Sequence, residues 1–313
     1  MGTRRGELRI FGTPKEPLFN MRPQGMSTEL LQDWLSILAT ENAEHMKQCS
    51  QRKSLFKCGL VTESVLLMAE RLKQPIHSRF LSAELFDRFM SKHIEDLWDY
   101  VVNMESEKRE KEWQAIQERI RNQMTLRMVS CIQLCSKLTS HAKVITCTKA
   151  RLVLQNIGHK FSAESILQSE LRVLKTLEYR VMVPSPLLFV ETLLEILGHS
   201  DQDVEVKVYH DVCTKVLDLV YMNRQMFYDK LYFVATGQPL DDPAKRKRFA
   251  SVEGDMMLLG TSAIAAATYI VDQSNTDKVV EELSKISKVP TDDILDFATI
   301  IVQEVIEGST SVY

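Results

Sequence analysis

Residues 124–138, MTLRMVSCIQLCSKL, constrain the fold of this chain more than any other segment. Their spacing predicts a helix whose apolar residues cover most of its circumference. A helix that is apolar on nearly every side must be surrounded by other elements. We therefore expect this segment to be the central helix of a helical bundle, with a lysine, Lys137, in its last apolar turn.

A second segment of this kind, residues 256–271, reads MMLLGTSAIAAATYIV. It is too short to span a bilayer comfortably and predicts a second buried helix. Only 11 glycines and 9 prolines occur among 313 residues, and apolar residues recur at helical spacing along most of the chain. We therefore predict an all-α protein with two halves, each built around one apolar helix.

The predicted helices set the domain boundaries. Residues 1–26 lack periodicity and predict a flexible N-terminal tail. Residues 27–183 contain an N-terminal helix (28–47) and a first helical domain, and residues 184–313 form a second. Ser162 is a predicted helix N-cap, and Ser185-Pro186 predicts the first helix of the second domain.

Bulk composition argues against several function classes. The net charge is −3, which disfavours direct nucleic-acid binding. The six cysteines form no C-x-x-C pair, and the histidines show no metal-ligand spacing, so we expect no disulfide framework, metal or cofactor. Hydrolase, phosphate-loop and zinc-protease motifs are missing from the sequence, and we expect no catalytic activity. No signal peptide or membrane span is predicted.

Two charged segments each have two interpretations. Residues 103–123 are dense in charge and carry a thin stripe of Trp113, Ile116 and Ile120, so they form either a solvated helix or a partner-binding helix. The basic run Lys245, Arg246, Lys247 and Arg248 lies in a predicted linker between Gly237 and Gly254. It is either a nuclear import signal or part of a solvated linker.

A set of short motifs in a fixed order resembles the cyclin box. The motifs are Asp87-Arg88-Phe89, Cys135-Ser136-Lys137, Glu170, and Leu177-Glu178-Tyr179-Arg180-Val181 followed by Pro184. The resemblance covers roughly residues 55–183, and residues 184–313 are similar to a second, more divergent box. It implies an all-α cyclin fold with two helical cyclin boxes.

The resemblance also implies a binding site for a cyclin-dependent kinase. In cyclins, the residues that match Lys137 and Glu170 bind the kinase, the lysine as donor and the glutamate as acceptor. An ammonium at a helix C-terminus is stabilised by the helix dipole and offers three donors to another chain. From the residues alone, two alternatives stay open: Lys137 extends past its neighbours to solvent, or it caps its own helix.

Two departures from the family pattern matter for function. Residues 57–61, KCGLV, stand where many cyclins have a Met-Arg-Ala-Ile-Leu stretch that docks substrates. Cys58 replaces the arginine that pairs with the aspartate of the Asp-Arg-Phe motif, so Asp87 must find another partner. The charged segment at about 100–123 is a helical insertion relative to the family.

Taken as a whole, the chain is similar to a cyclin-like family implicated in meiotic crossover formation. We expect a nuclear, chromosome-associated regulator, with some presence in the cytoplasm, whose partners are a cyclin-dependent kinase and meiotic recombination proteins. The alternative is a kinase-independent helical scaffold that recruits other recombination or ubiquitin-pathway factors. An unrelated α-solenoid is a weaker alternative, because no fixed repeat length is present.

Overall fold

The computed structural model describes residue 19 and residues 27–51, 54–139, 143–200 and 205–310. These residues form α-helices and one short 3-10 helix, without a strand among them. The helices are α1 (Thr28–Gln51), α2 (Gly59–Arg71), α3 (Ile76–Val102), α4 (Ser106–Thr139), α5 (Cys147–Asn156), α6 (Ala163–Thr176), α7 (Pro186–Ser200), α8 (Val206–Met222), α9 (Arg224–Thr236), α10 (Pro243–Glu253), α11 (Met256–Val271), η1 (Gln273–Asn275), α12 (Thr276–Ser287) and α13 (Thr291–Thr310). The prediction of an all-α protein is confirmed.

Several helices begin at a residue whose side chain accepts a hydrogen bond from a backbone amide of the first turn. The Ser162 hydroxyl accepts a hydrogen bond from the Ser165 amide and starts α6, as predicted. Thr146 and Asp255 do the same for α5 and α11. These caps fix the ends of the helices that pack around the two apolar segments.

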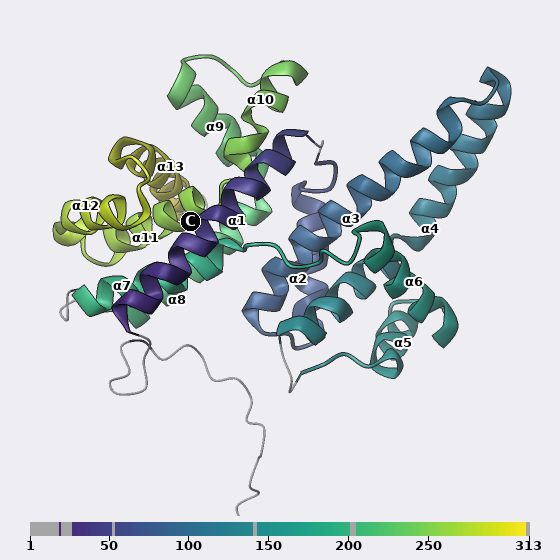
Figure 1. Ribbon diagram of the computed structural model, residues 1–313, viewed down its shortest axis with the longest axis horizontal. Helices are drawn as coiled ribbons and strands as arrows, with labels where there is room; N and C mark the ends of the chain where they lie inside the picture. Colours follow the sequence, from purple (N-terminus) through teal and green to yellow (C-terminus); the bar gives the residue numbers. More distant parts are fainter. Residues whose placement is uncertain (1–18, 20–26, 52–53, 140–142, 201–204, 311–313) are drawn as a thin grey trace, which may run out of the picture.

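Two bundles result, each built around one of the predicted central helices (Figure 1). In the first, the C-terminal half of α4 packs against α2, α3, α5 and α6, and residues such as Val129 and Ile132 are fully buried. In the second, α11 packs against α7, α8, α12 and α13 and is buried from Met256 to Thr268. Both central helices are therefore confirmed.

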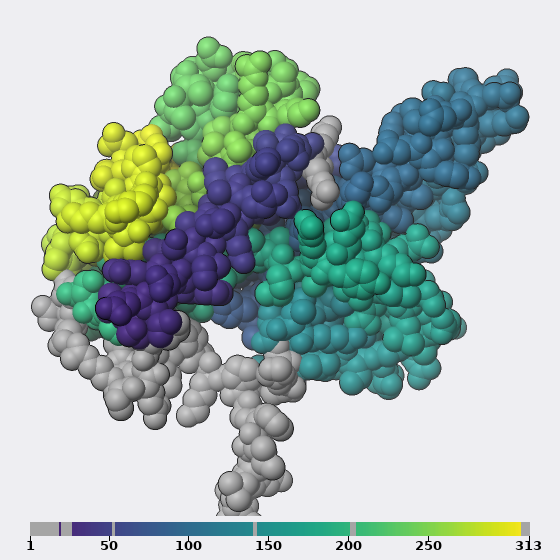
Figure 2. All heavy atoms as spheres, in the orientation of Figure 1, coloured from purple at the N-terminus to yellow at the C-terminus, as the bar shows by residue number. Residues whose placement is uncertain are grey.

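The charged segment 103–123 is not a separate helix, contrary to the sequence-based division at residue 124. Residues 106–123 of this segment are the first part of α4, which continues without a break for 34 residues. Its partner is α3, which has 27 residues, and the outer parts of α3 and α4 form a hairpin that projects from the body (Figures 1 and 2). No glycine or proline interrupts α4, so the change in composition does not end the helix.

The predicted linker between Gly237 and Gly254 also proves to be largely helical, which corrects that prediction. Asp242 caps α10 by accepting from the Ala244 amide, and Pro243 occupies the first helical turn. The basic run therefore lies on a helix. Lys247 and Arg248 are exposed there, whereas Arg246 binds Asp229 at 2.7 Å.

Helix α1 precedes the first bundle in the chain but packs mainly against the second. Its buried side chains, including Leu31, Leu35 and Leu38, belong to the core that α7, α8 and α11 share. In Figure 1, α1 runs across the front of the molecule, and its last turns approach α10. This position brings the end of α1 close to the junction of the two bundles.

Within the described residues, no single helix has the length and apolar character of a membrane span, although α10 and α11 pass that test together as a pair bent by 70°. Apart from Phe19, the predicted N-terminal tail lies outside the described residues.

Candidate functional site

Lys137 and Glu170, which the sequence places on two different helices, form an ion pair in the structure. Lys137 lies in the last turn of α4, and its ammonium donates to Oε1 of Glu170 on α6. The Lys137 side chain is 42% exposed, whereas the Glu170 side chain is 8% exposed. Lys137 therefore neither extends freely to solvent nor caps its own helix; it bridges two helices of the first bundle.

A buried polar network beneath this pair fixes how α4 and α6 align. The Ser169 hydroxyl oxygen, next to Glu170 in the chain, accepts from Arg127 Nη1 and from the Ser130 hydroxyl, each at 2.7 Å. Burial, with a smaller effect from Arg172, lowers the pKa of Arg127 to about 10, so the guanidinium is still charged at neutral pH. The network holds Glu170 in register with the end of α4.

The exposed part of this site combines charge with apolar surface. Leu138 directly follows Lys137 and is 44% exposed, and Leu167, one turn before Glu170 on α6, is 48% exposed. The ammonium has three donors, of which Glu170 takes one, and its exposure leaves room for acceptors from another molecule. The arrangement suits recognition of a protein surface that offers carbonyl oxygens beside apolar side chains.

Asp87 finds the alternative partners that the sequence required. Its carboxylate accepts from the Ser54 hydroxyl and from the Phe56 backbone amide, each at 2.9 Å, and from the Ser91 hydroxyl at 3.3 Å. These bonds tie the segment before α2 to α3. The neighbouring Arg88 donates to the Arg180 carbonyl at 3.1 Å and so links α3 to the chain that leaves α6.

Residues 57–61, at the position of the family's substrate-docking stretch, are divided between the interior and solvent. Lys57 turns inward and pairs with Glu84 of α3 at 2.8 Å. Leu60 is 80% exposed, and Cys58 is also exposed. The segment therefore does not present a continuous apolar patch.

A buried cluster around Glu84, at the junction of the bundles, was not predicted from the sequence. Glu84 is 1% exposed and accepts from the Tyr221 hydroxyl of α8 at 2.8 Å, while the Arg224 guanidinium lies over the Tyr221 and Tyr228 rings. Burial alone would raise the pKa of Glu84, but Lys57 and Arg224 outweigh it and lower the pKa to about 2. The only signal in the sequence is a glutamate on the apolar face of a helix.

The apolar stripe of Trp113, Ile116 and Ile120 faces inward rather than toward solvent. Trp113 contacts Trp98 of α3 edge to face at 5.0 Å, Ile116 is 2% exposed, and Ile120 packs against the core of the first bundle. The stripe joins α4 to α3. The stripe thus packs within the chain, and its role in partner binding stays a prediction.

Comparisons with known proteins identify the family. The chain is 32% identical over 287 residues to human (Homo sapiens) cyclin N-terminal domain-containing protein 1, covering 91% of this chain and 87% of the relative. The chain belongs to the cyclin N-terminal domain-containing protein 1 family. The mouse (Mus musculus) protein of the same name is 30% identical over 287 residues, covering 91% of this chain and 86% of the relative. A comparison with protein-family profiles gives no match.

Membership of the cyclin N-terminal domain-containing protein 1 family identifies the two bundles as cyclin boxes. The helices of this chain form a cyclin fold with two helical boxes, the second more divergent. Lys137 and Glu170 lie on the third and fifth helices of the first box, counted from α2.

Proposed function

We propose that the chain is a cyclin-like regulatory subunit that binds a cyclin-dependent kinase through Lys137 and Glu170 and promotes crossover maturation in meiotic recombination. The observation that carries the proposal is the Lys137–Glu170 pair at the exposed edge of the first box. It joins the two residues that the family motifs single out, on a surface with exposed leucines beside it.

By binding at this edge, the chain positions the kinase and takes no part in the chemical step of phosphoryl transfer. A cyclin-dependent kinase needs its regulatory helix placed so that the helix glutamate pairs with the catalytic lysine. Lys137 donates to carbonyl oxygens near that helix, and Glu170 accepts from kinase donors. The bound subunit has no catalytic activity of its own and selects where the kinase acts, on chromosomes in the nucleus of meiotic cells.

A charge swap tests this role. The variant Lys137→Glu with Glu170→Lys keeps an ion pair between α4 and α6 but reverses its polarity, so the fold is retained while kinase contacts are lost. We expect co-precipitation of a cyclin-dependent kinase from meiotic tissue to fall at least about tenfold, as for the loss of one charge-assisted contact. Undiminished kinase capture by the swapped protein would refute the site.

The matched control carries the same changes elsewhere on the same helices. Lys111→Glu and Glu164→Lys alter exposed residues of α4 and α6 that are remote from the pair, and we expect them to leave kinase capture unchanged. The disrupting variant Lys137→Glu with Glu170→Ala completes the set. Thermal melting of all variants separates lost binding from lost folding.

A kinase-independent scaffold is the second candidate, and the projecting α3–α4 hairpin is the observation that favours it (Figure 2). Its apolar stripe is buried between the two helices, but its outer surface carries Tyr100, which is 65% exposed. Such a scaffold recruits recombination or ubiquitin-pathway factors without a kinase. Partners that are captured normally by the charge-swapped protein but lost on Tyr100→Asp would support this function instead.

A further inference from the structure

Helix α1 exposes three large apolar side chains beside the face that it buries in the second box. Leu30, Trp34 and Ile37 are 56%, 37% and 51% exposed, respectively. Figure 2 shows α1 at the surface of the molecule along its length. Single apolar residues are common at protein surfaces, but apolar residues that gather on one face are typical of interaction surfaces. The exposed side of α1 is therefore a candidate docking surface.

This line of side chains continues along α1 as carboxylates. Leu30, Trp34, Ile37, Glu41 and Glu44 follow one another at alternating intervals of four and three residues, and all are exposed. We call these residues the outer row. Their spacing is that of the seam along which two helices pack in a coiled coil. The outer row thus offers a second helix a surface that is apolar over its first turns and acidic over its last.

The carboxylates of the outer row have no ion-pair partner within the described residues. Glu41 forms no such pair, and Glu44 accepts only from the neutral side-chain amide of Gln48, at 3.1 Å. Asp33, also exposed, adds a negative charge beside the row. Lys47 is the only lysine or arginine in the sequence of α1. The outer surface of this helix therefore carries an excess of negative charge.

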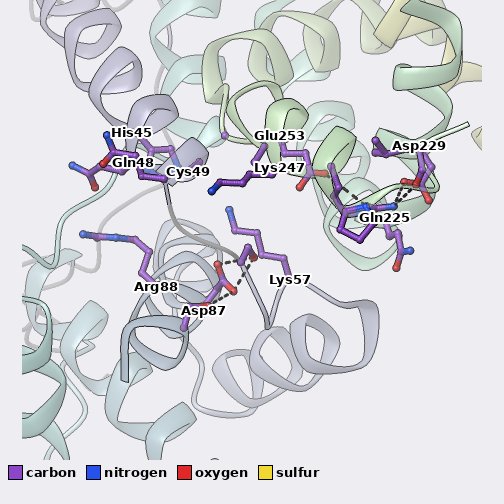
Figure 3. A pocket seen from close by; sticks show the side chains of 18 of the residues that line it. His45, Gln48, Cys49, Lys57, Asp87, Arg88, Gln225, Asp229, Lys247 and Glu253 are labelled. Atoms are coloured by element: carbon purple, nitrogen blue, oxygen red, sulfur yellow. Dashed lines mark hydrogen bonds and ion pairs between the residues drawn. The ribbon is translucent and has the colours of Figure 1, made fainter. Parts of the chain in front are cut away.

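The junction of the two boxes sets the end of the outer row. The next position at the same spacing, Gln48, lines a cavity of about 870 Å³ (Figure 3). Helix α10 packs against the last turns of α1 and brings Lys247 to the wall of this cavity. Neither Glu41 nor Glu44 lines the cavity. The outer row therefore comprises residues 30–44 and leaves the junction aside.

We propose that the outer row docks a basic amphipathic helix of another protein. Apolar side chains of that helix pack against the first half of the row, and its lysine or arginine side chains pair with Glu41 and Glu44. The apolar contacts supply affinity, whereas the charge pairs fix the register and exclude acidic partners. The row lies on a different helix from Lys137 and Glu170, so the proposal does not depend on kinase binding.

The charge pattern and the sequence argue against two other occupants. A second copy of the chain in a parallel pairing sets Glu41 against Glu41, and an antiparallel pairing centred on Ile37 sets Leu30 against the carboxylate of Glu44. The chain's own residues 1–18 hold four basic and two acidic residues. Three glycines and two prolines interrupt them, and these residues disfavour a helix as long as the outer row.

Binding of two designed, fluorescently labelled peptides to the full chain tests the proposal by anisotropy. Both peptides carry three leucines at the spacing of the outer row, and the next two positions are lysines in one peptide and glutamates in the other. Each is made in both sequence orders, because a partner helix can run parallel or antiparallel to α1. We expect the lysine peptide to bind at least about tenfold more tightly, because two attractive contacts replace two repulsive ones.

Three variants sharpen this test. Glu41→Lys with Glu44→Lys is expected to reverse the preference, so that the glutamate peptide binds more tightly. Ile37→Asp is expected to weaken binding of the lysine peptide at least about tenfold, because it sets a carboxylate against the leucines. Glu107→Lys with Glu110→Lys is the matched control, since it changes two exposed glutamates at the same spacing on α4. This control should bind like the unmodified chain.

Absent or equal binding of the two peptides, or a loss that the control shares, overturns the proposal. Dimerisation of the chain in sedimentation experiments that Ile37→Asp abolishes also overturns it, by showing a second copy on the row. Peptide binding that appears only after deletion of residues 1–18 overturns it in favour of the chain's own N-terminus. Lys137→Glu with Glu170→Lys should bind the peptides normally, which separates failure here from failure of the kinase site.

Discussion

At the scale of single residues, the Glu84 carboxylate supplies the negative charge that balances its cationic neighbours. It balances Lys57 and Arg224 in the interior, where an unpaired cation is costly. Glu84→Gln removes the negative charge with little change in shape. We expect the free energy of unfolding at pH 7 to fall by about 3–5 kcal/mol, measured by urea denaturation.

The pH dependence of this contribution follows from the lowered pKa of Glu84. The folded-state pKa of about 2 lies below the ordinary value of 4.5, so the unfolded chain takes up the proton first. The contribution is therefore complete above about pH 4.5 and is lost as the pH falls toward 2. Glu63→Gln, at an exposed site on α2, serves as the control. Equal stability of both variants would contradict the assigned role.

At this scale, the sequence motifs drew attention to residues that the structure pairs, and the role of these residues in kinase binding stays a prediction. The motif pattern singled out Lys137 and Glu170, and the need of Asp87 for new partners followed from Cys58. The partnership of Glu84 with Tyr221 joins residues 137 positions apart, and no local pattern encodes such a contact.

At the scale of elements, Ile116 is one of the buried side chains that join the two helices of the α3–α4 hairpin. We expect Ile116→Ala to loosen the hairpin locally, because this residue is 2% exposed and lies between the two helices. Amide exchange should rise at least about tenfold in residues 95–120, corresponding to a local loss of more than about 1.4 kcal/mol.

The control for the hairpin is Gln117→Ala, the exposed neighbour on α4, which should leave amide exchange unchanged. Exchange in α11 should be the same in both variants, because the hairpin projects away from the second box (Figure 2). A uniform rise over the whole chain would show that the hairpin and the boxes unfold as one unit instead.

Helix positions were largely predictable from the sequence, although α9 was not predicted, and two other errors have physical reasons. The boundary placed at residue 124 marked a change from exposed to buried surroundings, and a continuous helix passes through such a change without a break. The stretch before Gly254 resembled a linker because of its charge. Its start signal, Asp242 followed by Pro243, was present in the sequence and outweighs composition.

At the scale of the whole molecule, Gly59 sets how closely the two boxes approach. A Cβ atom added at Gly59 would lie 2.6 Å from the Met222 carbonyl oxygen, a backbone atom at the end of α8. We expect Gly59→Ala to force the boxes apart and to lower the free energy of unfolding by about 1–3 kcal/mol, as for other overpacked contacts. Thermal unfolding measures the effect.

Ser64→Ala, at an exposed position on the same helix, is the control for Gly59→Ala. The two boxes are also joined by Arg79 and Asp218 at 3.1 Å, so the variant should remain a folded chain with a weaker junction. Unchanged stability of Gly59→Ala would show that α2 and α8 slide past each other without cost. The sequence did not reveal this close approach, because the two segments that meet are far apart in the chain.

The continuity of α4 has a mechanical consequence. Its 34 residues span about 50 Å at the rise of an α-helix, from the tip of the hairpin to the turn that carries Lys137. A single uninterrupted helix resists bending, so the hairpin is a rigid element of fixed length. Two proteins that bind the tip and the base of the hairpin are therefore held a fixed distance apart. A displacement of one end of α4 moves the other end with it.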